Sequence, residues 1–492
     1  MANEKNHLHK TVILGVIVLI LLLAAQFIPS YTMFGFTTKK INILSDLSVK
    51  NKNSQQDDDQ HYADSLQRVR DSLQLIHQKA ILASIEDSVR QIRIDSVKRA
   101  SLARMDSLGK SVVAIEDYSV GGDALAHFFK MLSKRKDMNR PIRVAFLGDS
   151  FIEGDIIVAD VREQLQNKYG GRGIGFVPMA SAVATYTPSV HHTFKNWKSY
   201  SIIQKKDGEE RFMPQGVTFA PLSGATAQFE GVKWKPNLDS YQRARLLYVN
   251  NGTGRVGVQV NGRDTTWQNL SAKGTVDQIV SKGDIRRIAY SFDATGDTRI
   301  LGVVLEDSTG VSVDNYSVRG NSGLWMNRVN KPLSNQLDKL MHYDLVVLQY
   351  GVNVVESNVL SYGAYRQSMV KVINHLKSCM PGASFLVLSI GDRSTQQDGE
   401  FVTMPGVHGM IKAQKQIAQE CGVAFWNMFD AMGGENSMVR YVENNWASKD
   451  YTHISHAGGR RIANALMKAL MLEADKYEAI YQIENNQTVD EN

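Results

Sequence analysis

Cysteine is nearly absent from this sequence, because only Cys379 and Cys421 occur among its 492 residues. Two cysteines cannot build a disulfide framework, a cysteine-rich zinc module or a cysteine-ligated cluster, and the sequence leaves open whether they pair. A strong charge of one sign is also absent, since 56 Lys and Arg side chains against 50 Asp and Glu leave a net charge of +6. So small an excess over this length gives no reason to expect a nucleic-acid partner.

A nucleotide-binding loop is missing as well. Residues 170–175 carry a Gly-Gly-x-Gly-x-Gly pattern, but it follows a predicted helix and lacks the Gly-Lys-Ser/Thr ending of a phosphate loop. The chain has room for two to four domains at roughly 100–200 residues each. Its 43% hydrophobic and 22% charged residues are typical of a folded protein rather than a disordered one.

One long hydrophobic run stands near the N-terminus, after a short head of residues 1–10. Residues 11–28 contain no charged side chain. At about 1.5 Å per residue, a helix over residues 11–30 is long enough to cross a bilayer. A cleaved signal peptide is the alternative, but its cleavage site would be a poor one, so we expect an uncleaved single-pass anchor. Two lysines flank each side of the run, so the positive-inside rule gives no clear orientation.

Residues 31–114 are expected to connect this anchor to the first domain. Residues 37–60 are polar and predict a linker. Residues 61–110 contain no proline and almost no glycine, and their charges balance, which predicts a solvated helical stalk. Residues 66–83 follow a short heptad pattern that Asp87 breaks. A self-associating coiled coil and a lone spacer helix therefore both remain open.

From residue 115 onward, apolar runs alternate with helical stretches. Continuous apolar strands of this kind are typical of a parallel sheet covered by helices on both faces. The predicted fold is therefore α/β, a flavodoxin-like three-layer parallel sheet over residues 115–184 and 313–475, followed by a polar tail at 476–492. The apolar runs are residues 144–147, 345–350, 385–389 and 423–426.

Residues 185–312 interrupt this pattern. Short β-rich runs alternate with turn signals there, including Asn-Gly dipeptides at 251–252 and 261–262 that favour hairpins. We expect an inserted β-sandwich or jelly-roll-like domain. Three tryptophans of this region either stack on sugar rings or fill its core, and we favour the core for each. They are Trp197, Trp234 and Trp267.

A candidate nucleophile, Ser150, ends the first predicted strand, where ligands bind in parallel sheets. A serine hydroxyl needs an adjacent base. His453 is suited to take its proton, and Asp450, three residues earlier, to orient the imidazole and stabilise its charged form. The N–H groups of Ser150 and Gly320 and the amide of Asn353 suit a tetrahedral oxyanion.

Simpler roles are open to some of the residues around this site. Ser150 alone would suit a helix cap, but a distant Asp-x-x-His pair favours the nucleophile. Asp149 is expected to form the turn or start a helix rather than act as an acid. His456 has no evident companions for a metal site and is expected to be a surface histidine.

Together, four motifs in this order resemble the SGNH (GDSL-type) hydrolases. Each motif is common by itself, but four in order beside predicted strand ends are a specific signal, and the resemblance covers about residues 115–475. The motifs are Gly148-Asp149-Ser150, the glycine turn at Gly320, Gly351-x-Asn353 and Asp450-x-x-His453.

Within that superfamily the flanking segments resemble bacterial peptidoglycan O-acetylesterases, which also carry a Gly-x-Gly-Phe-Val segment, here residues 173–177, and an insert similar to a carbohydrate-binding module. The resemblance implies the catalytic and oxyanion roles given above. Two positions depart from the family pattern, Val354 where Asp is frequent and Phe151 where a polar residue is frequent. Neither departure removes a member of the triad, and both are expected to bear on the acyl pocket or the acceptor.

The resemblance implies a membrane-anchored serine esterase with its catalytic domain in the bacterial periplasm. It would remove O-acetyl groups from an envelope glycan, peptidoglycan above all, with no metal or organic cofactor. One alternative is an O-acetyltransferase that moves acetyl from a membrane O-acyltransferase partner to the glycan. Another is a non-catalytic glycan-binding protein. The acyl group, the sugar position and the oligomeric state stay open.

Overall fold

The structure is a computed structural model that describes Val18, two short strands and residues 55–107, 112–204, 211–295 and 297–485. The short strands are β1 (Thr32–Met33) and β2 (Phe36–Thr37). The chain divides into two units, Met1–Gln91 and Ile92–Asn492. The anchor predicted at residues 11–30 lies, apart from Val18, outside the described residues. Within the described ranges, no helix combines the length and the apolar character needed to span a bilayer.

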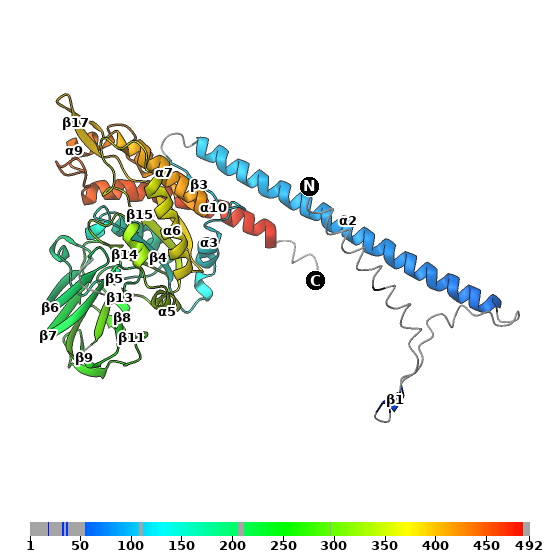
Figure 1. Cartoon of the computed structure of the whole chain (residues 1–492), viewed down its shortest axis with the longest axis horizontal. Helices are drawn as coiled ribbons and strands as arrows, with labels where there is room; N and C mark the ends of the chain where they lie inside the picture. The colour runs from blue at the N-terminus through cyan, green and yellow to red at the C-terminus, as the bar shows by residue number, and fades with distance from the viewer. Residues whose placement is uncertain are drawn as a thin grey trace. The chain divides into compact units, whose positions relative to one another are not determined.

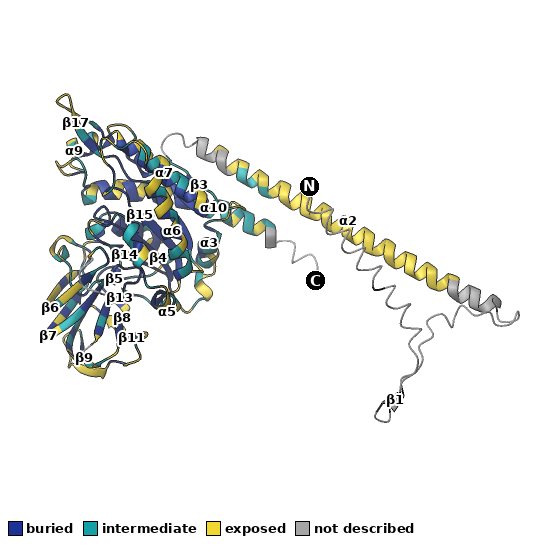
Figure 2. Ribbon diagram, viewed as in Figure 1, coloured by how far each residue is buried: buried dark blue, intermediate teal, exposed yellow. Residues whose placement is uncertain are grey.

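A single helix, α2 (Gln55–Ser107), occupies most of the predicted stalk. Its apolar side chains from Leu66 to Ile92 are exposed, and Figure 2 shows exposure along most of the helix. Nothing in the described residues covers these side chains, so the choice between a coiled coil and a lone spacer helix stays open.

The unit from Ile92 onward contains a six-stranded sheet in the order β14–β4–β15–β16–β19–β3. The first five strands are parallel, and only the edge strand β3 runs antiparallel, against β19. In chain order the parallel strands are arranged 2-1-3-4-5, which is the flavodoxin-like order. The predicted parallel sheet is confirmed, whereas the edge strand β3 was not predicted. The strands are β3 (Ile115–Asp117), β4 (Ile142–Gly148), β14 (Val311–Ser317), β15 (Tyr343–Gln349), β16 (Ser384–Leu388) and β19 (Ala424–Trp426).

Helices cover both faces of this sheet (Figure 1). Alternate side chains of a strand point to opposite faces. Leu345 and Val347 of β15 therefore join one apolar core, while Val346 and Leu348 join the other. The first face packs against α3 (Ala126–Ser133), α4 (Val158–Tyr169) and α10 (His456–Asn485), and the second against α5 (Lys331–Met341), α6 (Gly363–Cys379) and α7 (Gly406–Cys421). Two short helices precede the Asp-x-x-His segment, α8 (Met428–Met432) and α9 (Ser437–Glu443).

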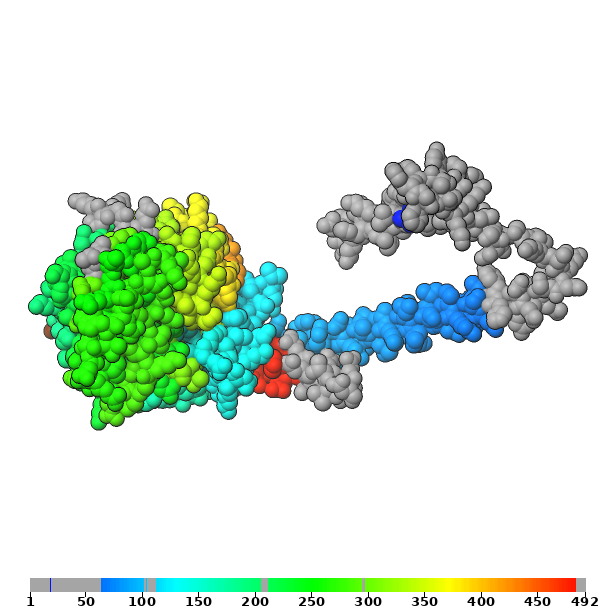
Figure 3. Space-filling model, turned by 90° about the horizontal axis from the view of Figure 1, so that it is seen from below, coloured from blue at the N-terminus to red at the C-terminus, as the bar shows by residue number. Residues whose placement is uncertain are grey.

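The insert is built from strands, as predicted, and its nine strands are linked by hydrogen bonds into one sheet. They form one broad surface, coloured green in Figure 3. Two strands lie across the predicted bounds of the insert. β5 precedes the predicted start at residue 185 but pairs with β13 of the insert, and β14 of the central sheet begins before residue 313. The strands are β5 (Gly175–Val177), β6 (His191–Ser201), β7 (Val217–Glu230), β8 (Tyr241–Asn250), β9 (Thr253–Val260), β10 (Thr266–Asn269), β11 (Val276–Ile285), β12 (Arg287–Thr295) and β13 (Thr298–Glu306).

One of the two predicted hairpins is wrong. The dipeptide at 261–262 does lie in the turn of an antiparallel pair, β9 and β10. The dipeptide at 251–252 instead connects β8 to β9, which pair with other strands. The side chain of Asn250 closes this turn, because its Oδ1 accepts from the Gly252 N–H at 3.1 Å and its Nδ2 donates to the Gly252 carbonyl at 2.8 Å.

Buried charges fasten the insert to the central sheet. Arg143 of β4 is fully buried and donates to Glu306 of the insert and, at 2.8 Å, to Asp314 of β14. Arg245 of the insert lies 3.2 Å from the same Glu306. Burial raises the pKa of Glu306, but the neighbouring guanidinium groups outweigh it and hold that pKa at about 2. Arg143 is therefore the cation that these two buried carboxylates share.

Arg143→Met is expected to lower the free energy of unfolding by about 3–5 kcal/mol, because it leaves two buried carboxylates without their shared cation. Urea unfolding of both proteins at neutral pH measures the difference. Arg255→Met is the matched control, since Arg255 and Asp293 form an ion pair with both side chains more than half exposed, for which about 0–1 kcal/mol is expected. Equal losses in the two variants would contradict the prediction.

Candidate active site

Ser150 lies just past the carboxyl end of β4, where the chain turns sharply. A side chain at Gly148 would come within 2.9 Å of the Gln349 carbonyl oxygen, so only glycine allows this approach of the two strands. Ser150 itself is 6% exposed. Phe151, the first departure from the family pattern, is buried in the core between the sheet and α4. Its ring therefore points away from the surface that a substrate reaches.

The Asp-x-x-His segment forms a compact turn before α10. Asp450 Oδ1 accepts hydrogen bonds from the backbone N–H of Thr452 at 3.0 Å and of His453 at 2.9 Å. The hydroxyl of Ser448 donates to the same oxygen at 2.5 Å. An aspartate that caps its own turn in this way explains the three-residue spacing, because the turn brings the carboxylate beside the imidazole.

The structure brings the three predicted catalytic side chains together. Ser150 Oγ lies 3.1 Å from His453 Nε2, across 303 residues of sequence. His453 Nδ1 lies 2.7 Å from Asp450 Oδ2. A hydrogen-bonded chain of this kind lets the imidazole take the serine proton while the carboxylate fixes its tautomer.

Hydrogen bonds keep the Asp450 carboxyl group in its ionised form. Partial burial raises the pKa of Asp450, but bonds from Ser448, from the backbone and ring of His453 and from Thr452 outweigh it, so the pKa lies well below its usual value. Asp450 is therefore ionised throughout the neutral range, as the stabilisation of a protonated imidazole requires.

His456, the other histidine of this segment, is engaged elsewhere. Its Nε2 lies 3.1 Å from the carbonyl oxygen of Gly154, and the side chain is half-buried rather than on the open surface. No cluster of potential metal ligands occurs among the described residues. The arrangement makes His453, and not His456, the histidine beside the serine.

The predicted oxyanion donors lie at the same end of the sheet. The N–H groups of Ser150 and Gly320 meet no acceptor within the described parts of the chain, so both are available to a substrate. Asn353 is engaged, because its Nδ2 donates to Asp149 Oδ2 at 3.0 Å and to the Asn321 carbonyl at 3.2 Å. Asn353 must release one of these partners before it can donate to an oxyanion.

Asp149 has a role that the sequence did not reveal. It is completely buried, and its Oδ1 accepts from the Phe151 N–H at 2.9 Å while its Oδ2 holds the amide of Asn353. Burial raises the pKa of Asp149 to about 7, despite these two hydrogen bonds. The Gly-Asp-Ser motif pointed to this residue, but only the fold shows that it ties the serine loop to Asn353.

Asp149→Asn is expected to change how stability depends on pH. The folded pKa of about 7 exceeds the unfolded value of about 4. Between these values the folded protein holds a proton that the unfolded chain has lost, so the wild type becomes less stable as pH rises from about 4 to 7. The variant should lack this slope, which is at most about 1.4 kcal/mol per pH unit. Urea unfolding across that range measures it, and identical slopes would contradict the assignment.

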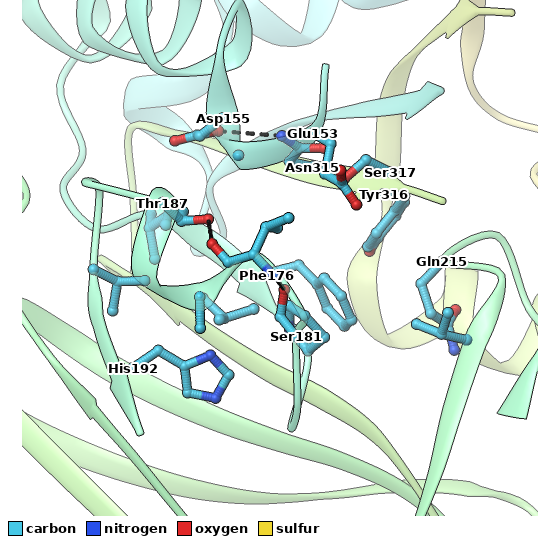
Figure 4. Close-up of a pocket in the computed structure, with 18 residues that line it drawn as sticks. Glu153, Asp155, Phe176, Ser181, Thr187, His192, Gln215, Asn315, Tyr316 and Ser317 are labelled. Atoms are coloured by element: carbon cyan, nitrogen blue, oxygen red, sulfur yellow. Dashed lines mark hydrogen bonds between the residues drawn. The ribbon is translucent and has the colours of Figure 1, made fainter. Parts of the chain in front are cut away.

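A cavity of about 90 Å³ lies between the central sheet and the insert. Figure 4 shows it bordered by Glu153 and Asn315 on one side and by His192 on another. None of the five predicted catalytic and oxyanion residues lines it. The side chains of His453 and Asp450, the predicted base and its partner, are instead 40% and 50% exposed. The histidine and the aspartate beside the buried Ser150 are therefore open to solvent.

The fold is the SGNH fold with an inserted β-domain, and Ser150, His453 and Asp450 form a hydrogen-bonded chain at the carboxyl end of its parallel sheet. A solved peptidoglycan O-acetylesterase matches 73% of this chain over 99% of its own, with 23% sequence identity and a TM-score of 0.60. At that identity the likeness establishes the fold.

Two further solved structures that match the chain are much less similar than this one. An acetyl xylan esterase from Geobacillus stearothermophilus matches 33% of this chain and 73% of its own, at 17% identity and a TM-score of 0.25. A family two carbohydrate esterase from Cellvibrio japonicus matches 58% of this chain and 98% of its own, at 9% identity and a TM-score of 0.25. Scores this low support no argument. No family model and no curated protein matches the sequence.

Proposed function

We propose that this protein is a serine esterase that removes O-acetyl groups from a cell-envelope glycan, with O-acetylated peptidoglycan as its substrate. The observation that carries the proposal is the continuous contact from Ser150 through His453 to Asp450, with the distances of 3.1 and 2.7 Å given above. The similarity in fold to a peptidoglycan O-acetylesterase supports the choice of glycan.

In the first half of the reaction, Ser150 Oγ attacks the acetyl carbonyl carbon while His453 Nε2 takes the serine proton. The N–H groups of Ser150 and Gly320 stabilise the negative oxygen of the tetrahedral intermediate. The bond to the sugar oxygen then breaks, and His453 returns its proton to that oxygen. The products at this point are a free sugar hydroxyl and acetyl-Ser150.

In the second half, water attacks acetyl-Ser150 and His453 accepts one of its protons. The second tetrahedral intermediate collapses, acetic acid leaves with the other proton of the water, and His453 returns its proton to Ser150 Oγ. Asp450 stays ionised and compensates the charge of the imidazolium in both halves. Each cycle consumes one ester and one water and yields one sugar hydroxyl and one acetic acid.

The open position of the site supports a polymeric substrate. Small ligands are usually bound in clefts that bury most of their surface, whereas His453 and Asp450 are 40% and 50% exposed. A glycan strand that passes over this surface presents acetyl esters to Ser150 without being enclosed. The uncharged run at residues 11–28 supports a membrane anchor, and we propose that the catalytic unit faces the periplasm.

Acetate release from O-acetylated peptidoglycan by the full-length protein in detergent tests the proposal. We expect release by the wild type and none above background by Ser150→Ala. Acetyl xylan and 4-nitrophenyl acetate serve as comparison esters. Acetate from xylan but not from peptidoglycan would assign a different glycan. Acetyl transfer to added glycan oligomers in place of release would identify an O-acetyltransferase, and no reaction with any ester would refute the esterase.

A further inference from the structure

The three tryptophans of the insert have different surroundings. Trp197 packs with its ring centroid 5.0 Å from that of Phe292, and its Nε1 donates to the Thr226 carbonyl at 2.8 Å, so it completes the core of the insert as predicted. Trp267 and Trp234 are 45% and 37% exposed. The prediction of a core position is therefore wrong for both of these exposed rings.

Trp234 lies next to the catalytic loops. It belongs to the connection between β7 and β8, and its ring centroid lies 5.4 Å from that of His456, edge to face. His456 in turn contacts Gly154, which follows Ser150 by four residues. The side chain of His456 therefore lies between Trp234 and the segment that carries Ser150, and His456 itself belongs to the segment that carries His453.

The backbone of a second exposed aromatic residue borders the same loop. The Tyr186 carbonyl oxygen lies 3.5 Å from the position of a Cβ on Gly154, and the Tyr186 residue is 76% exposed. The serine loop is therefore flanked by two exposed aromatic residues from outside the sheet. Trp267 differs, because it lies on the edge strand β10, where Arg255 covers its ring at 4.7 Å.

The position of Trp234 is fixed by the neighbouring residue. Lys235 is 8% exposed, and its Nζ lies 2.8 Å from Asp160 and 2.7 Å from Glu163, both on α4. The same Nζ lies 5.1 Å from the centroid of the Trp234 ring. A nearly buried ammonium group held by two carboxylates ties this connection of the insert to the catalytic sheet, so the ring is held in position before any substrate binds.

We propose that Trp234 is the surface on which a sugar ring of the glycan stacks while the acetyl ester of the same strand reaches Ser150. The inference deepens the proposed function and rests on it for the identity of the glycan. An aromatic ring offers an apolar face to the C–H groups of a sugar, and its polar edge stays in water. The insert therefore contributes to substrate choice beside the catalytic residues.

Kinetics with two substrates test this role. For Trp234→Ala, the ratio of kcat/KM on O-acetylated peptidoglycan fragments to kcat/KM on 4-nitrophenyl acetate should fall about tenfold, mainly through KM for the fragments. Trp267→Ala, the same change on an exposed tryptophan away from the site, should keep the wild-type ratio. Equal ratios in all three proteins would overturn the inference and leave the esterase proposal intact.

Fluorescence tests binding without catalysis. Full-length Ser150→Ala protein in detergent is titrated with O-acetylated peptidoglycan disaccharide oligomers, and its tryptophan emission is followed. The change should persist when Trp267 is also replaced by Phe and disappear when Trp234 is replaced by Phe. A change that survives Trp234→Phe would overturn the inference. The two proposals can also fail separately. If the emission change is lost with Trp234 but the wild type hydrolyses no ester, the stacking surface is retained and only the esterase is refuted.

Discussion

Replacing Ser150 with alanine is expected to lower kcat for acetyl-ester hydrolysis by about 10⁴- to 10⁶-fold. The reason is chemical, because without Oγ no acetyl-enzyme forms and the proton accepted by His453 has no source. The change removes a single atom from a residue that is 6% exposed, so the fold should be retained. Acetate release and urea unfolding of both proteins measure the two effects separately.

The control for this variant is Ser133→Ala, which removes a hydroxyl from an exposed serine at the end of α3. It should keep wild-type kcat. If Ser150→Ala were active within tenfold of the wild type while folded, the nucleophile would have to be another group, and the proposed acetyl-serine intermediate would be refuted. Mass spectrometry of wild-type protein quenched during turnover should find the added acetyl group on Ser150.

The second large effect is expected for His453→Ala, with a loss in kcat of the same order, because triad members act as a unit. His456→Ala is the matched control, since it removes the same side chain three residues further along. His456 bonds to the Gly154 carbonyl rather than to Ser150, so its loss should lower kcat by less than about tenfold. Steady-state kinetics on 4-nitrophenyl acetate compare the two variants.

The reverse order of these two effects would assign the base to His456 and contradict the geometry. The double variant Ser150→Ala with His453→Ala adds a further check. Residues that act in one proton transfer have non-additive effects, so the double variant should be scarcely less active than either single variant. Fully additive losses would show that the two residues act in separate steps.

The sequence predicted the central fold because its strands are marked strongly. The runs at residues 144–147 and 345–348 are apolar throughout, and a strand buried on both faces of a parallel sheet needs such a run. β3, three residues at the antiparallel edge, carries too short a pattern to be recognised. The hairpin predicted from Asn-Gly at 251–252 was wrong because a dipeptide determines only a local turn. The pairing partners of β8 and β9 depend on contacts with strands far away in the chain.

The residues of the candidate site were also predictable in part. Ser150, Asp450 and His453 stand in short motifs whose chemistry is recognisable, and a motif needs only local spacing. The partner of Asn353 was not predictable, because Asp149 is completely buried and its effect on Asn353 depends on two strand ends meeting. The exposed position of Trp234 was likewise missed, since a tryptophan in a β-rich segment fits a core as well as a surface.

The sequence by itself determined the alternation of strands and helices, the β-rich insert and the residue types needed for ester hydrolysis, since these follow from local pattern and composition. Only the tertiary structure decided that Ser150 Oγ and His453 Nε2, 303 positions apart in the chain, lie 3.1 Å from each other. It also decided that Trp234 of the insert stands beside His456. Such proximities result from the packing of the whole sheet and from buried charges such as Arg143, which act between segments that are distant in sequence.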